Sequence, residues 1–323
     1  MTIKISVALA TFNGERYLRQ QLESIAAQSC PPDELIACDD QSTDDSYRIL
    51  QEFASSAKFA VHVYLNDQRL GVTRNFEKAI RICAGDVIAL SDQDDIWNRE
   101  KLELFENVFA SSDAGLVFTD AELVDAALKS DSRSLWQAVG FNSKRQKLAA
   151  HGRTLEVLLQ SNVVSGATMA FRAGFRDAVL PIPVDEGLLH DGWIALIIAA
   201  MAEIRFISEP LIKYRQHRAQ TIGAPKRATI KNLIPLHKTD PVYYLEQANR
   251  FQRVHDRLAA NEARLPDPRV MTTLSKKIVH LRARGGMPDL RRRRLPIVLS
   301  ETLNHHYHQY SNGWFSAAKD LLV

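Results

Sequence analysis

Short apolar runs and amphipathic stretches alternate along the first part of this chain, and this pattern constrains the fold more than any other feature. Residues 3–10, 34–38, 61–65, 87–90 and 115–119 are expected to form strands, and residues 15–28, 42–54, 72–84 and 101–110 carry apolar side chains at helical spacing. We expect Ser42 and Thr43 to cap the second helix and Gly85 to end the third. The alternation predicts an α/β fold, with a mostly parallel sheet covered by helices.

The second part of the chain has a different pattern. Residues 130–153 resemble an irregular connection, residues 168–171 and 204–207 resemble strands, and helices are expected at residues 228–238, 241–264 and 269–284. Residues 226–323 hold 18 Lys and Arg against 8 Asp and Glu, whereas the remainder carries a net charge of −7. We therefore predict an α/β domain at residues 1–225 and a basic, mainly helical region at residues 226–323.

The sequence also predicts where the protein resides. No apolar run reaches the roughly 18 residues of a membrane-spanning helix, and the apolar amino-terminal run lacks the charged start and cleavage site of a signal peptide. The cysteines Cys30, Cys38 and Cys83 form no C-x-x-C pair and are odd in number, which favours free thiols in a reducing compartment. We therefore expect a cytoplasmic protein.

Closely spaced carboxylates follow the fourth expected strand, in the segment Ser91-Asp92-Gln93-Asp94-Asp95. Carboxylate oxygens are the ligands that Mg²⁺ and Mn²⁺ prefer, and these ions usually bind together with substrate phosphates. Polar side chains also end the first, second and fifth strands, at residues 11–14, 39–42 and 119–120. Because ligands bind at the carboxyl ends of the strands in open sheets, we expect cations or ligand donors to neutralise this edge.

The sequence lacks two motifs that bind phosphate groups in other proteins. Their absence limits the ways in which this chain can hold the phosphates of a substrate. Residues 11–16 lack the G-x-G-x-x-G loop of dinucleotide-binding oxidoreductases, and no P-loop with its lysine occurs. We therefore expect a metal ion and side chains to hold the substrate phosphates. Asp191 opens an apolar helix expected at residues 193–202, and His217 lies in a basic loop that returns to the acidic edge. Alone, Asp191 would more readily be a helix cap.

Eight segments stand in a set order along the chain: residues 7–18, 20–29, 38–46, 70–76, 85–97, 165–171, 190–193 and 214–217. Together they resemble the inverting family-2 glycosyltransferases with a GT-A type fold, and most nearly the rhamnosyltransferase-like enzymes of bacterial surface-polysaccharide synthesis. Each segment is weakly specific, but their order and spacing make the set strongly specific. The resemblance covers about residues 3 to 223. It implies a GT-A type nucleotide-sugar-binding sheet covered by helices, a nucleoside-diphosphate sugar donor, bound Mg²⁺ or Mn²⁺, and a glycan or lipid-linked saccharide acceptor.

The resemblance also implies roles for individual residues. Asp191 would be the general base, Asp94 a metal ligand, and His217 a further metal ligand or a diphosphate contact. The residues that would bind the nucleotide-sugar are, on the nucleoside side, Thr11, Asn13, Glu15, Asp39 and Asp40, and, on the diphosphate and sugar side, Arg74, Asp92, Ser165, Gly166 and Arg215. Asp92 would reach either the ribose or the metal.

The sequence departs from the family pattern at two places. The acidic pair that precedes the acceptor helix in many members is His190-Asp191 here, so only Asp191 carries over. The Gln-x-x-Arg-Trp motif of processive members is absent after residue 200, which argues for transfer of single sugars. Two other classes stay open: a sugar nucleotidyltransferase, which would need a basic glycine-rich loop where Asn13-Gly14-Glu15 stands, and a non-catalytic nucleotide-binding scaffold.

The basic region carries four consecutive arginines at residues 291–294, flanked by Leu290 and Leu295. Such a segment predicts peripheral contact with the anionic inner face of the cell membrane, where each arginine contributes on the order of 1 kcal/mol. A solvated helical face is the alternative explanation. Nucleic acid is not an expected partner, because no aromatic residues are interleaved with the arginines.

Overall fold

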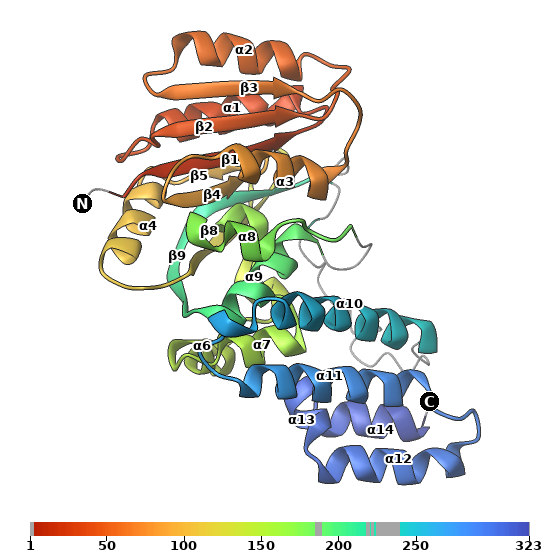
Figure 1. Ribbon diagram of the computed structural model, residues 1–323. Helices are drawn as coiled ribbons and strands as arrows, with labels where there is room; N and C mark the ends of the chain where they lie inside the picture. Colours follow the sequence, from red (N-terminus) through yellow and green to blue (C-terminus); the bar gives the residue numbers. More distant parts are fainter. Residues whose placement is uncertain (1–2, 185–188, 218–219, 221–222, 224–239, 323) are drawn as a thin grey trace.

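The computed structural model describes residues 3–184, 189–217, 220, 223 and 240–322 (Figure 1). The first part of the chain forms the predicted alternation: β1 (Ile5–Thr11), α1 (Glu15–Ala26), β2 (Glu34–Asp39), α2 (Ser46–Ser56), β3 (Ala60–Leu65), α3 (Val72–Ile82), β4 (Val87–Ser91), α4 (Lys101–Ala110) and β6 (Leu116–Asp125). The other strands are β5 (Ile96–Trp97), β7 (Ser130–Ser134), β8 (Met169–Arg172) and β9 (Ile204–Gln216). The α/β fold is therefore confirmed.

The strands form one mixed sheet in the order β3-β2-β1-β4-β8-β6-β9-β5, with β7 paired to β6. Strands β1 to β4 are mutually parallel, and β9 is parallel to β6. The sheet is mostly parallel, as predicted, with three exceptions: β8 runs antiparallel to both of its neighbours, and the short strands β5 and β7 are antiparallel to their partners. The chain leaves β6 at its carboxyl end and re-enters the sheet from the same edge, which reverses β8.

Side chains of the central strands alternate between two apolar layers. In β1, Val7 and Leu9 pack with α1, α2 and α4, whereas Ala8 packs with α3 and α9 (His190–Met201). All three side chains are fully buried. Burial on both faces accounts for the continuous apolar runs in the sequence. The parallel pairing of β1 with β2 and with β4 places the carboxyl ends of these strands side by side at one edge of the sheet.

The two helix ends for which a cap was predicted differ from the prediction. Helix α2 begins at Ser46 and not at residue 42, because the Ser42 hydroxyl donates to Asp39 (2.7 Å) while the Asp44 carboxylate accepts from the Ser46 N–H (3.0 Å). Helix α3 ends at Ile82, before Gly85. Gly85 serves a packing purpose, since a Cβ there would lie 2.8 Å from the Lys4 carbonyl oxygen.

The segments predicted to be irregular are more ordered than expected. Residues 130–153 contain β7, α5 (Leu135–Val139) and α6 (Ser143–Ala150). Thr119-Asp120 is not a strand end, because β6 continues to Asp125 and the Asp120 carboxylate accepts from the Trp136 N–H in α5 (2.9 Å). Residues 214–216 are the last residues of β9 and not a loop.

The carboxy-terminal region is helical, as predicted, and packs beneath α7 (Thr154–Gln160) and α9 (Figure 1). Its helices are α10 (Pro241–Ala259), α11 (Arg269–Gly285), α12 (Arg291–Leu303), α13 (His306–Tyr310) and α14 (Trp314–Leu322). Val254, Leu258 and Leu274 belong to the same apolar cluster as α9. The two parts of the chain therefore share a core, while the helix predicted at residues 228–238 lies outside the described residues.

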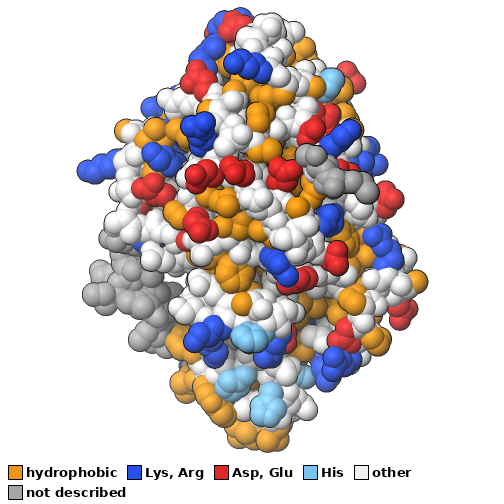
Figure 2. All heavy atoms as spheres, turned by 90° about the vertical axis from the view of Figure 1, so that its left-hand side faces the viewer, with side chains coloured by type: hydrophobic (Ala, Val, Ile, Leu, Met, Phe, Trp, Pro, Cys, Tyr) orange, Lys and Arg blue, Asp and Glu red, His pale blue; other side chains and the backbone are white. Residues whose placement is uncertain are grey.

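Side chains of different kinds gather on different parts of the molecular surface. On the face drawn in Figure 2, acidic side chains form a row across the upper half, and histidines gather in the lower half, toward the carboxy-terminal helices. No helix among the described residues is long and apolar enough to cross a membrane.

Candidate active site

A cavity of about 520 Å³ opens at the carboxyl edge of the sheet. This volume lies within the range of small-molecule sites in proteins, roughly 300–1,000 Å³. Its walls come from the ends of β1, β4 and β9, the start of α3, the segment before β8 and the start of α9. The sequence-predicted residues that line it are Thr11, Asp40, Asp92, Asp94, Ser165, Gly166 and Asp191.

Asp94 and His217 meet at this edge although 123 residues separate them. The His217 Nε2 atom lies 2.7 Å from Asp94 Oδ2, and both side chains are almost buried. Arg215 holds the two segments together: its backbone N–H donates to Asp95 (3.1 Å) and its Nε donates to the Asp94 carbonyl oxygen (2.8 Å). The guanidinium is buried and does not line the cavity, so in this structure it positions the acidic turn.

Negative charge is concentrated around this turn. Burial, together with the charges of Asp94 and Asp191, raises the pKa of Asp92 to about 7. Asp95 is fully buried, and burial raises its pKa well above the usual range. Beneath the turn, the buried Lys101 donates to the Ala167 carbonyl oxygen (2.8 Å). A cation bound at this turn would favour the ionised carboxylates and so lower these pKa values.

The donor atoms at the turn fit a divalent cation. Carboxylate oxygen and imidazole nitrogen are suitable ligands for Mn²⁺, and Mg²⁺ is usually held by one or two carboxylates together with substrate phosphates. Asp94 and His217 form such a pair. Among the described residues, three side chains bring ligand atoms within 4.8 Å of one another only at His280, Glu301 and His306, in the carboxy-terminal helices. Because Asp94 and His217 supply only two ligands, this pair suits a cation that also binds the diphosphate of a substrate.

The predicted nucleoside residues divide into two groups. Asp40 lines the cavity and accepts hydrogen bonds from the Leu70 and Gly71 N–H groups (2.6 and 2.8 Å), which fixes the turn before α3. Asp39 is fully buried and accepts from the hydroxyl of Thr11 (2.9 Å). These contacts place Thr11 and Asp40 against the space in which a ligand would lie.

The other predicted binding residues lie outside the cavity lining. Asn13 and Glu15 are exposed and accept hydrogen bonds from the N–H groups of Thr43 (2.8 Å) and Asp45 (3.0 Å), which fastens the loop before α2 to the loop after β1. Arg74 forms an ion pair with Glu77 on α3 (2.7 Å).

Asp191 stands in the first turn of α9 and lines the same cavity as Asp92 and Asp94. Its Oδ1 accepts from the Gly192 N–H (2.6 Å), and the helix amino terminus favours its negative charge. Gly166 lies against this turn, because a Cβ there would come within 2.7 Å of His190 Nε2 and 3.7 Å of Asp191 Cβ. His190 itself is buried and stacks on Phe76 (4.2 Å between ring centroids).

Gln93 and Arg69 are two polar residues of the cavity wall that the sequence did not predict. The Gln93 amide exchanges two hydrogen bonds with the Phe12 backbone (2.8 and 3.0 Å), which joins the ends of β1 and β4. Arg69 stacks on the Phe12 ring, 3.8 Å from its centroid, and brings a positive charge to the cavity. Gln93 was visible inside the acidic motif, whereas nothing in the local pattern marked Arg69.

The mixed sheet and the cavity at its carboxyl edge agree with the GT-A type fold that the sequence predicts. The sequence model of the family described as "Glycosyl transferase family 2" matches residues 6–179, and the chain belongs to this family. An uncharacterized glycosyltransferase of Nostoc sp. is 28% identical over 235 residues, which is 70% of this chain and 69% of the relative.

Other relatives are similar over shorter stretches. A dTDP-rhamnosyl transferase of Shigella flexneri is 33% identical over 99 residues, which covers 29% of this chain and 34% of that protein. A UDP-Glc:alpha-D-GlcNAc-diphosphoundecaprenol beta-1,3-glucosyltransferase of Escherichia coli is 25% identical over 121 residues, 38% of this chain and 47% of that protein. The chain thus spans less than half the length of these two relatives.

The fold is shared with solved structures at low sequence identity. The structure of S. aureus TarS residues 1–349 in complex with UDP-GlcNAc superposes with a TM-score of 0.58 at 16% identity, covering 99% of this chain and 88% of that one. The similarity extends through the carboxy-terminal helices of this chain.

Proposed function

We propose that this protein transfers a single sugar, with inversion, from a nucleoside-diphosphate donor to a hydroxyl of a glycan or lipid-linked saccharide in cell-surface polysaccharide synthesis. The observation that carries the proposal is that Asp92, Asp94 and Asp191 line one cavity at the carboxyl edge of the sheet. A carboxylate that can accept a proton and a pair of side chains that can bind a cation are the two groups that the proposed transfer needs.

The roles of the residues follow from the charges that change during transfer. Asp191 takes the proton of the acceptor hydroxyl as that oxygen attacks the sugar. Asp94 and His217 would hold Mg²⁺ or Mn²⁺, which when bound stabilises negative charge on the departing diphosphate. Asp40 and Thr11 support the nucleoside end through the hydrogen bonds described above. Ser165 and Gly166 shape the side of the cavity next to Asp191.

The proposed donor is a sugar linked to a pyrimidine nucleoside diphosphate, with dTDP-rhamnose as one candidate. The names of the relatives in Shigella and E. coli, which refer to dTDP-rhamnose and UDP-glucose, support this choice. We expect calorimetry with UDP, dTDP, GDP and ADP to show tight binding of one pyrimidine diphosphate, and only with Mn²⁺. Binding of none of the four would refute the donor site.

Membership of the glycosyltransferase family argues against the sugar nucleotidyltransferase alternative. A non-catalytic scaffold would share the fold and would be recognised by donor binding without turnover. The intact set of Asp92, Asp94 and Asp191 in one cavity favours catalysis.

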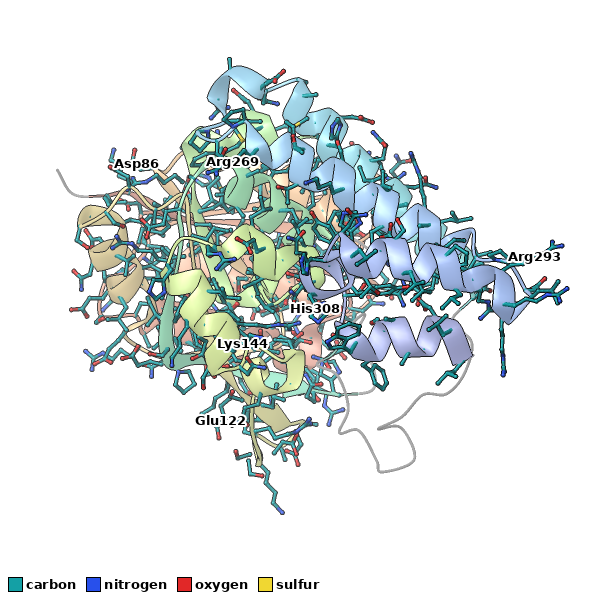
Figure 3. All side chains as sticks on the ribbon, turned by 90° about the horizontal axis from the view of Figure 1, so that it is seen from below. Asp86, Glu122, Lys144, Arg269, Arg293 and His308 are labelled. Atoms are coloured by element: carbon teal, nitrogen blue, oxygen red, sulfur yellow. The ribbon has the colours of Figure 1, made fainter. Side chains whose placement is uncertain are left out.

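We also propose that α12 contacts the membrane surface. Leu295, Leu299 and Leu303 share one helix face and are 48%, 51% and 78% exposed. At the start of the helix, Arg293 points away from the protein (Figure 3). Arg294 is buried and donates to the Asp320 carbonyl oxygen (3.1 Å), so three of the four arginines are available to lipid. An apolar face beside exposed arginines suits an anionic interface.

We expect the protein to sediment with vesicles that contain phosphatidylglycerol and not with pure phosphatidylcholine. Leu299→Glu should weaken this binding by about tenfold, since burial of a leucine contributes about 1.5–3 kcal/mol. Ser300→Glu, at the exposed neighbouring position, adds the same charge and should have a much smaller effect. Equal losses in the two variants would argue against contact through this face.

A further inference from the structure

A second cavity, of about 490 Å³, lies between α7 and α9 on one side and α10, α11, α13 and α14 on the other. Figure 1 shows these helices gathered in the lower half of the molecule. The second cavity adjoins the candidate active site, because Asn162 lines both cavities and Gly192, which follows the proposed base Asp191, lines the second. A molecule in the second cavity would therefore lie beside Asp191.

The lining of the second cavity is basic. Its charged residues are Arg250, Lys277, Arg284 and Lys319, and no acidic side chain occurs among the described residues that line it. This contrasts with the donor cavity, where the carboxylates gather. A lining with basic and no acidic side chains favours an anionic ligand.

Lys277 is the most informative of these residues. Its side chain is 4% exposed, its Nζ donates to the Tyr310 carbonyl oxygen (2.7 Å), and no described carboxylate forms an ion pair with it. Burial, together with the charge of Arg284, lowers the pKa of Lys277 to about 7. A buried ammonium group is costly unless an anion accompanies it. The Nζ atom has three N–H donors, so a bound phosphate could accept those that Tyr310 does not use.

Arg284 has a different role, because its charge is already balanced. Its guanidinium donates to both carboxylate oxygens of Asp320 (2.7 and 2.9 Å) and to the hydroxyl of Tyr244 (2.7 Å). These bonds hold Arg284 and the Tyr244 ring in place in the cavity wall. The second cavity is thus built on fixed side chains.

Aromatic side chains complete the lining. The rings are those of Tyr243, Tyr244, Phe251, Tyr310 and Phe315. Aromatic rings pack on the apolar faces of sugar rings, and apolar walls with a few placed polar groups are typical of small-molecule sites. The lining therefore combines surfaces for a saccharide with donors for an anion.

We propose that the second cavity binds the phosphate-bearing end of the acceptor saccharide, with Lys277 as the phosphate ligand. This inference rests on the glycosyl transfer proposed above. The phosphate would lie against Lys277 while the sugar extends past Asn162, so that its hydroxyl reaches Asp191. The acceptor class is then a sugar phosphate or sugar diphosphate, whether free in solution or linked to a lipid.

The test is calorimetric titration, in metal-free buffer, of glucose 1-phosphate, methyl α-glucoside and farnesyl diphosphate. We expect glucose 1-phosphate to bind and the uncharged glucoside to bind at least about tenfold more weakly, the effect of losing a charge-assisted hydrogen bond. Lys277→Met should weaken phosphate binding by a similar factor. Lys276→Met, at the exposed neighbouring position on α11, is the matched control and should bind as wild type.

Tighter binding of farnesyl diphosphate with the same dependence on Lys277 would identify a lipid-linked diphosphate as the source of the phosphate. Absence of binding of both phosphate compounds, or unchanged affinity in Lys277→Met, would overturn the proposal. If Lys277→Met does not fold, the comparison of glucose 1-phosphate with methyl α-glucoside on the wild-type protein still tests the proposal. Parallel titrations of nucleoside diphosphate with Mn²⁺ test the donor site. A failure of the proposed transfer function is thereby distinguished from a failure of the phosphate site at Lys277.

Discussion

Asp191→Asn should reduce turnover by roughly 10²–10⁴-fold, the usual contribution of a general base. Nucleotide binding should be retained or slightly improved, because the variant removes one of the charges that raise the pKa of Asp92. Asparagine can still accept the hydrogen bond from the Gly192 N–H and serve the start of α9. The substitution therefore separates proton abstraction from helix capping. The measurement is single-turnover transfer together with calorimetric donor affinity.

Asp177→Asn is the matched control for this experiment. Asp177 is exposed and also lies in the first turn of a helix, α8 (Arg176–Val179), and it does not line the active-site cavity. The control should transfer sugar at the wild-type rate. Wild-type turnover in Asp191→Asn would show that Asp191 is a cap, and the base would then have to be sought elsewhere on the cavity wall.

Asp94→Ala should abolish the Mn²⁺-dependent part of nucleoside-diphosphate binding, with a loss of at least about 100-fold. Loss of a residue that only orients a metal ligand lowers metal affinity by about 10–100-fold. Asp94 is proposed to be a ligand itself, so its loss should have a larger effect. The variant also removes the carboxylate that contacts His217 at 2.7 Å. Titration of Mn²⁺ and of the diphosphate, each in the presence of the other, measures the effect.

Asp113→Ala provides the comparison, since Asp113 is exposed between α4 and β6 and is absent from the cavity lining. It should bind Mn²⁺ and nucleotide as wild type does. If Asp94→Ala kept the wild-type Mn²⁺ affinity, the assignment of the metal to this turn would be wrong. The transfer reaction would then depend on the basic residues of the wall, beginning with Arg69.

The sequence predicted the first strands well because they are buried on both faces, which leaves a continuous apolar run with clear ends. Strand β9 was recognised only at residues 204–207, since Glu209 and Pro210 interrupt the apolar pattern of the rest. Residues 130–153 were not recognised as ordered because their elements are short. Long-range contacts, such as that between Asp120 and Trp136, stabilise them.

The candidate site was predictable to the extent that strand ends carry its side chains. The sequence could not show which residues line the cavity and which fasten its loops. Asp39 and Asp40 are adjacent and chemically identical, yet only Asp40 faces the cavity. Its hydrogen bonds to the backbone at Leu70 and Gly71 depend on a loop 30 residues away. The burial of Lys277 likewise depends on the packing of α11 against α13, which a lysine in an amphipathic helix does not reveal.

Because Val254, Leu258 and Leu274 complete the apolar layer on α9, the carboxy-terminal helices cannot be exchanged as a module without exposing that layer. Relatives with this arrangement would be expected to change acceptor by substitution of side chains between the two parts, and not by recombination of whole domains. A shortened chain that ends near residue 225 should accordingly be a poor starting point for engineering, since it would lack one wall of its own core.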